Sequence, residues 1–224
     1  MTVPRPRSTW LMLIAAIIIS FILVNPYLGL DIDDSRLDVG GSLHYSLLVA
    51  HIFTAAVAIV LGPLQFMSKV RARRTLHRTI GRVYLLAGVL PSAVTAIPVA
   101  LWSGRIVTQI GLVTAATLWL ITGGLAYRAV RRRDFIGHRD WMMRNYALTF
   151  LAVSSRVLTP LLLLAQLPFI PDGRPIGERV PSLIPIGQTL GWIANLVVAE
   201  SIISRRRRRR SGMHTNAGKG TIRW

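Results

Sequence analysis

Residues 43–67 read LHYSLLVAHIFTAAVAIVLGPLQFM, a stretch of 25 residues without a single Asp, Glu, Lys or Arg. At a helical rise of about 1.5 Å per residue this stretch would extend roughly 37 Å, which exceeds the ~30 Å hydrocarbon core of a bilayer. It therefore predicts a transmembrane helix. Outward from it, further apolar stretches predict an all-α, polytopic transmembrane helical bundle of about six spans, at approximately 10–30, 43–67, 83–102, 106–127, 141–167 and 183–204.

The predicted spans leave no room for a separate globular domain. We expect residues 1–204 to form a single six-helix domain and residues 205–224 to form a basic, disordered tail. The composition agrees with a membrane protein, because 52% of the residues are hydrophobic, only 16% are charged and the mean hydropathy is +0.48. A soluble domain usually carries about 25% charged residues.

The formal net charge of +18 does not predict a nucleic-acid-binding protein. The basic residues flank apolar spans, and no basic domain with interleaved aromatic residues is present. The absence of Cys excludes disulfides, thiolate metal sites and iron–sulfur clusters. The sequence also lacks a glycine-rich phosphate loop, a nucleophile elbow and an HExxH zinc motif, and it leaves open whether the protein is an enzyme.

The distribution of Lys and Arg predicts how the protein is oriented. If the N-terminus is cytoplasmic and the spans alternate, 22 of the 27 Lys and Arg residues lie in cytoplasmic segments. The opposite face then holds only Arg36, Arg105, Arg174 and Arg179. Cytoplasmic loops of membrane proteins carry this excess of positive charge. We therefore expect a cell-membrane protein with both termini in the cytoplasm and a basic face that contacts anionic lipid headgroups.

Polar side chains inside the spans form the first candidate site. Arg156 lies about 22 Å above the inner end of the fifth predicted span, which places it in the outer half of the bilayer with His51. Asn145, Thr149 and Arg156 follow helical spacing and predict one stripe that faces the bundle interior. Because polar and ionisable side chains in a span are costly, these four residues are candidates for ligand binding. The alternative is that they only bond neighbouring helices.

A second group of candidates lies at the cytoplasmic edge of the spans. His77 and His138 each precede an outgoing helix, so we expect them at the same depth. Two such histidines could ligate a b-type haem or a metal ion, or contact lipid phosphate. Glu200 is the only acidic residue in any predicted span, and Arg144 and Arg82 at a similar depth predict an ion pair for it.

Several motifs in this chain resemble those of a known family. They are His51 with Gly62-Pro63-Leu64-Gln65-Phe66, His77-Arg78 with Gly81-Arg82-Val83-Tyr84, His138 with Trp141-Met142-Met143-Arg144-Asn145-Tyr146-Ala147-Leu148, and Arg156. In these motifs the chain resembles the bacterial predicted membrane protein family catalogued as domain of unknown function 2306. The resemblance covers about the second to the fifth predicted span. It implies a polytopic membrane protein and no particular reaction.

The sequence leaves three functions open. The first is binding or transport of a small anionic or lipid-like molecule in the intramembrane His/Arg/Asn site. The second is membrane electron transfer with a b-type haem or a quinone, for which His77 and His138 are the one remaining histidine pair. The third is a non-catalytic structural or assembly role, in which the polar residues hold the helices together.

Overall fold

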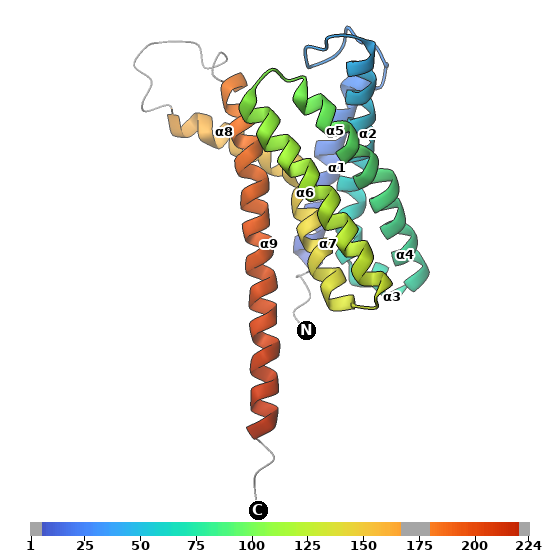
Figure 1. Ribbon diagram of the computed structural model, residues 1–224, viewed down its shortest axis with the longest axis vertical. Helices are drawn as coiled ribbons and strands as arrows, with labels where there is room; N and C mark the ends of the chain where they lie inside the picture. Colours follow the sequence, from blue (N-terminus) through green and yellow to red (C-terminus); the bar gives the residue numbers. More distant parts are fainter. Residues whose placement is uncertain (1–5, 167–179, 220–224) are drawn as a thin grey trace, which may run out of the picture.

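The computed structural model describes residues 6–166 and 180–219, with side chains over 8–166 and 180–211. Every regular element in these ranges is helical, and Figure 1 shows the helices as one bundle from which the end of α9 projects. The predicted all-α class is therefore confirmed. The elements are α1 (Pro6–Val24), η1 (Asn25–Tyr27), α2 (Ser42–Phe66), α3 (Ser68–Ala72), α4 (Arg74–Val83), η2 (Tyr84–Val89), α5 (Leu90–Leu101), α6 (Ile106–Arg131), α7 (Phe135–Thr149), α8 (Leu151–Gln166) and α9 (Val180–Lys219).

The number of spans agrees with the prediction if one broken span is included. In the described parts of the chain, five helical stretches are long and apolar enough to cross a membrane, at 8–27, 42–66, 74–101, 106–131 and 180–211. Helices α7 and α8 pass the same test only when they are taken together. The predicted span 141–167 corresponds to this pair, which is not one straight helix, because α7 and α8 meet at a bend of 47°.

The bend between α7 and α8 lies where a side chain from α9 contacts the helix backbone. Asn195 donates from Nδ2 to the carbonyl of Ala147 at 3.0 Å and to Ser154 Oγ at 2.9 Å. In a continuous α-helix the carbonyl of Ala147 would accept from residue 151. A side chain inserted into the helical hydrogen-bond ladder is a common cause of a kink. Helix α8 consequently turns off the axis of α7 and crosses α9 (Figure 1).

The third predicted span, 83–102, is longer than expected. The helical path runs from Arg74 to Leu101 through α4, η2 and α5, with a wider π-helical turn in η2. In this turn the N–H of Leu90 bonds to the carbonyl of Leu85, five residues earlier. Pro91 follows directly, and a proline has no N–H and clashes with the carbonyl four residues before it. Such π-turns occur frequently at functional sites.

Two basic segments that we expected to be irregular are helical. Most of the predicted loop 69–82 lies in α3 and α4, and α9 continues through the arginine run to Lys219 instead of ending near residue 204. Arginine is a good helix former. In addition, Arg206 and Arg207 contact side chains of α7, which gives this part of α9 a tertiary partner.

The basic helix ends gather at one end of the bundle, which we call the basic end. Figure 1 shows α3, the start of α4, the end of α6 and the start of α7 at this end, where α9 leaves the bundle. The predicted grouping of the basic segments on one side agrees with this arrangement, and its assignment to the cytoplasm stays a prediction. Between the two ends, a core of residues from α2, η2, α6 and α7 is tightly packed. A Cβ at Gly88 would lie only 2.9 Å from Ala58 Cβ, so a glycine is needed where η2 approaches α2.

Candidate functional site

The four residues of the predicted intramembrane site do not form one site. Asn145 and Thr149 lie together in the core of the bundle and are 0% and 6% exposed. His51 bonds to a serine on α5. Arg156 lies beyond the bend, on α8, and bonds to its own helix. The structure therefore separates the predicted site into three different settings.

Asn145 and Thr149 belong to a closed hydrogen-bond network around Tyr84. The hydroxyl of Tyr84 donates to Asn145 Oδ1 at 2.6 Å and lies 2.8 Å from Thr149 Oγ1. Trp119 donates from Nε1 to Thr149 Oγ1 at 2.9 Å. The amide of Asn145 donates to the carbonyl of Trp119 at 2.8 Å and to Thr122 Oγ1 at 3.0 Å. This network joins η2, α6 and α7, and the bonds use both amide hydrogens and the carbonyl oxygen of Asn145, which indicates a structural role.

His51 has a separate set of contacts with Ser92, which is 0% exposed. Its Nδ1 lies 2.9 Å from the carbonyl of Ser92 and 3.0 Å from Ser92 Oγ. A carbonyl oxygen only accepts, so Nδ1 carries the proton, and Ser92 Oγ donates to the carbonyl of His51 at 3.3 Å. These bonds hold α2 against α5.

Arg156 is exposed and does not share a face with Asn145 and Thr149, because the bend at Phe150 interrupts the predicted stripe. Its Nη1 donates to the carbonyl of Ala152 at 2.8 Å and to Ser155 Oγ at 3.3 Å. The expectation that the stripe continues to this residue is therefore wrong. A binding role for the arginine itself stays a prediction.

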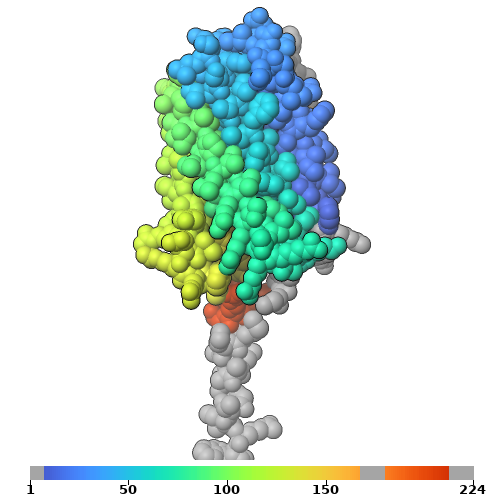
Figure 2. Space-filling view, turned by 90° about the vertical axis from the view of Figure 1, so that its right-hand side faces the viewer, coloured from blue at the N-terminus to red at the C-terminus, as the bar shows by residue number. Residues whose placement is uncertain are grey.

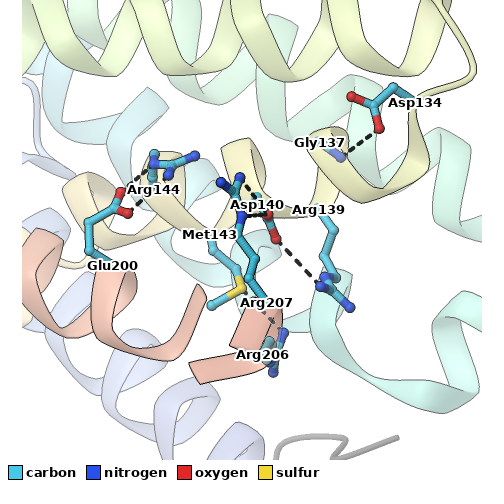
Figure 3. Close-up of polar contacts among 9 residues, drawn as sticks. All are labelled: Asp134, Gly137, Arg139, Asp140, Met143, Arg144, Glu200, Arg206 and Arg207. Carbon is cyan, nitrogen blue, oxygen red and sulfur yellow. Dashed lines mark hydrogen bonds and ion pairs between the residues drawn. The ribbon is translucent and has the colours of Figure 1, made fainter. Parts of the chain in front are cut away.

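At the basic end, two ion pairs join α7 to α9 (Figure 3). Arg144 donates to both carboxylate oxygens of Glu200, which is the pair that the sequence predicted. Glu200 is nonetheless 49% exposed, and Arg82 is exposed and makes no ion pair with any residue that the structure describes. The second pair, between Arg207 and Asp140 at 3.1 Å, was not predicted.

Asp140 is 1% exposed and has a second cation beside it. Arg139 Nη2 lies 3.4 Å from Asp140 Oδ1, and Arg207 contacts Asp140 Oδ2, so the carboxylate lies between two guanidinium groups. Figure 3 shows the two arginines approaching Asp140 from different helices, with Arg206 alongside. Arg206 also lies within electrostatic range of Arg139 and of Arg71 from α3. The buried carboxylate of Asp140 therefore has three arginines near it, and Arg71 adds a fourth positive charge close to Arg206.

The two predicted histidines at this end lie within electrostatic range of each other. His138 Nδ1 lies 2.9 Å from the carbonyl of Ala126, so this nitrogen carries the proton and Nε2 has a free lone pair. His77 Nδ1 is buried and has no hydrogen-bond partner among the described residues. The described residues contain no group of three or more His, Cys, Asp or Glu side chains that could hold a metal ion. Haem ligation by the two histidines stays a prediction.

Two more buried nitrogens at the basic end lack partners in the described part of the chain: Gln65 Nε2 and Arg139 Nε. Gln65 is 6% exposed, and it lies against α4, because a Cβ at Gly81 would be 3.3 Å from its Oε1. Figure 2 shows the basic end from the side of α4, with the orange-red part of α9 visible below the teal segment of α3 and α4 and the yellow connection from α6 to α7. We call the following set the basic-end cluster: Gln65, Arg71, His77, His138, Arg139, Asp140, Arg206 and Arg207.

Sequence reasoning placed His77 and His138 at this end but missed the rest of the cluster. Gln65, Arg139 and Asp140 stand inside or next to the motifs quoted above, so their position in the motifs was the available signal. Their burial could not be inferred, because it depends on how α4, α7 and α9 pack together.

Comparison with known proteins gives one match. A family model described as "Predicted membrane protein (DUF2306)" matches residues 48–203. No curated protein and no solved structure matches the chain. The matched region includes Gln65, both histidines and Asp140, and it ends just before the arginine run of α9.

Proposed function

This chain belongs to the DUF2306 predicted membrane protein family, and from that premise we propose that it binds a phosphate-bearing anion at the basic-end cluster. The observation that carries the proposal is that three buried nitrogens at the basic end, Gln65 Nε2, His77 Nδ1 and Arg139 Nε, have no partner among the described residues. The nitrogens of Gln65 and Arg139 are donors, and Nδ1 of His77 is a donor when it carries the ring proton. A buried donor that lacks an acceptor costs about 1–3 kcal/mol. An anion with several oxygen atoms can accept from more than one of them.

The charges of the cluster support the same proposal. Among the described residues, Arg139 and Arg207 contact the carboxylate of Asp140, Arg206 lies within electrostatic range of it, and Arg71 lies within electrostatic range of Arg206. Arg139 and Arg206 are partly buried, and cations that are partly removed from water repel one another unless an opposite charge lies nearby. A bound anion would supply the missing negative charge.

Phosphate is the anion that this donor set favours. Arginine presents a planar fork of N–H donors that matches the spacing of phosphate oxygens, and charge-assisted bonds to phosphate are among the strongest in proteins. The amide of Gln65 adds an uncharged donor. A free phosphate compound and a lipid headgroup offer the same chemistry here.

The proposal is tested on the full chain in non-ionic detergent, by thermal unfolding with inorganic phosphate and with chloride at equal ionic strength. At a phosphate concentration about 100 times the dissociation constant, we expect a stabilisation of roughly 2.7 kcal/mol over chloride. Arg139→Gln should abolish this difference. Arg131→Gln is the matched control, because it removes one exposed arginine at the same end of the bundle. Equal responses to phosphate and chloride in the unmodified chain would refute the proposal.

A second candidate function, binding of a b-type haem, is favoured by one observation. Nδ1 of His138 is held by the carbonyl of Ala126, which orients Nε2 as a free ligand atom. The absorption spectrum of the chain purified after haem-replete expression tests this candidate. A Soret band that His138→Ala removes would support it, and a colourless protein would refute it.

A further inference from the structure

A shallow, open groove of about 440 Å³ runs along one face of α9, and all the residues that line it belong to α9. Its lining changes along its length from apolar to polar side chains in the direction of the basic end: Trp192, Leu196, Val197, Glu200, Ser201 and Ser204. At a rise of about 1.5 Å per residue, the distance from Trp192 to Ser204 along the helix is roughly 18 Å. The hydrocarbon layer of one leaflet is about 15 Å thick, or half of ~30 Å. The groove therefore has the length of a single acyl chain in the leaflet next to the basic end.

The polar end of the groove leads directly to positive charge. Arg205 and Arg208 follow Ser201 and Ser204 by four residues each, so they continue the same face of α9. Both are exposed, and neither takes part in an ion pair with the residues that the structure describes. Arg207, by contrast, is paired with Asp140. Beside the polar end of the groove there are thus two guanidinium groups without an ion-pair partner among the described residues.

The one carboxylate in the groove does not oppose an anion at this position. Glu200 is neutralised by Arg144, which forms two hydrogen bonds to it. The groove consequently has apolar side chains at one end, polar side chains without net charge next to them, and positive charge at the other end. This order matches the acyl chain, the glycerol esters and the phosphate of a phospholipid that bears net negative charge.

We infer that this groove holds one acyl chain of an anionic phospholipid whose phosphate lies at the basic end. The inference rests on the proposed function, because it takes the phosphate at the basic end to be that of a lipid, which Arg205 and Arg208 would bind beside Arg206 and Arg207 of the basic-end cluster. It adds a chain-binding site on α9 that the basic-end cluster alone does not contain.

The test compares two neighbouring valines in the full chain by native mass spectrometry. Val197 lines the groove and is 59% exposed, whereas Val198 is 57% exposed and is not among the groove residues. Dioleoylphosphatidylglycerol and dioleoylphosphatidylcholine are added in turn to the detergent-purified protein. We expect the unmodified chain to bind phosphatidylglycerol in preference to phosphatidylcholine. Val197→Trp should weaken the binding of phosphatidylglycerol about tenfold, which corresponds to the loss of about two buried methylene groups. Val198→Trp should leave this binding unchanged. Arg205→Gln together with Arg208→Gln should remove the preference for phosphatidylglycerol.

Three outcomes would overturn the inference, and each has a distinct meaning. Equal binding of phosphatidylglycerol by Val197→Trp and Val198→Trp, with the response to inorganic phosphate intact, refutes the groove and leaves the proposed function standing. If Val197→Trp instead converts an oligomer to a monomer without changing lipid binding, the groove is an interface between copies of this chain. If inorganic phosphate does not stabilise the unmodified chain, the proposed function fails and the inference fails with it.

Discussion

Replacing Tyr84 with Phe removes one hydroxyl group from the middle of the bundle and leaves the ring in place. The variant loses the bond donated to Asn145 Oδ1 at 2.6 Å and the contact with Thr149 Oγ1 at 2.8 Å. Hydrogen bonds between transmembrane helices contribute on average about 0.6 kcal/mol each and at most about 1.7 kcal/mol. Two lost bonds therefore predict a decrease of about 1–3 kcal/mol in the free energy of unfolding.

The assay is reversible unfolding in mixed micelles, with the affinity for inorganic phosphate measured in parallel. Tyr127→Phe is the matched control, because Tyr127 is 56% exposed and should change the free energy of unfolding by less than about 0.5 kcal/mol. Since the network around Tyr84 is structural, Tyr84→Phe should lower stability without changing phosphate affinity. The reasoning is refuted if stability changes no more than in the control, or if phosphate affinity falls with it.

Three further predictions concern packing and charge. Gly62→Ala should be strongly destabilising in the same unfolding assay, because a Cβ at this position would lie 2.0 Å from the ring of Tyr146. The control Gly124→Ala, whose Cβ would have no neighbouring atom within 4 Å, should be neutral or stabilising by up to ~1 kcal/mol, and equal effects of the two substitutions would contradict this packing. Asp140→Asn should lower the free energy of unfolding, because it leaves Arg139 and Arg207 without their carboxylate, yet raise the affinity for phosphate in a titration; weaker phosphate binding would contradict this expectation. A double-mutant cycle on Arg144 and Glu200 should give a coupling free energy of no more than about 1 kcal/mol for unfolding, because Glu200 is 49% exposed. A much larger coupling free energy would show that the pair is better shielded from water than we infer.

The membrane architecture could be predicted from the sequence because a bilayer imposes a simple rule on each segment. An apolar stretch such as 43–67 has to be helical to satisfy its backbone, and its length can be compared directly with the hydrocarbon thickness. The grouping of the basic segments was predictable for a similar reason, since it follows from alternation of the spans. Neither inference requires knowledge of how the helices pack.

The features that were missed all depend on contacts between helices. The bend after α7 follows from the bond between Asn195 and the carbonyl of Ala147, two residues 48 positions apart in the sequence. The same bend removes Arg156 from the predicted stripe, so a local periodicity argument fails there. Helical spacing correctly placed Asn145 and Thr149 on an interior face, but it could not show that Tyr84 and Trp119 occupy their hydrogen-bonding groups.

The continuation of α9 at the basic end also depends on a contact between helices and was therefore missed. A basic, disordered tail was expected from the run of six arginines onwards. In the structure Arg207 has the buried carboxylate of Asp140 as its partner, and the helix continues. The sequence contained both residues, but nothing in their spacing of 67 positions indicated the contact.

The most direct test of anion binding at the basic-end cluster uses an uncharged change within it. Gln65→Leu removes a buried amide nitrogen that has no partner among the described residues, without altering the net charge. One hydrogen bond to a charged group contributes about 1.5–3 kcal/mol, so calorimetric titration with inorganic phosphate should show an affinity roughly 10- to 100-fold weaker in a protein that unfolds no more easily. A Gln65→Leu variant that binds phosphate as tightly as the unmodified chain would contradict the account.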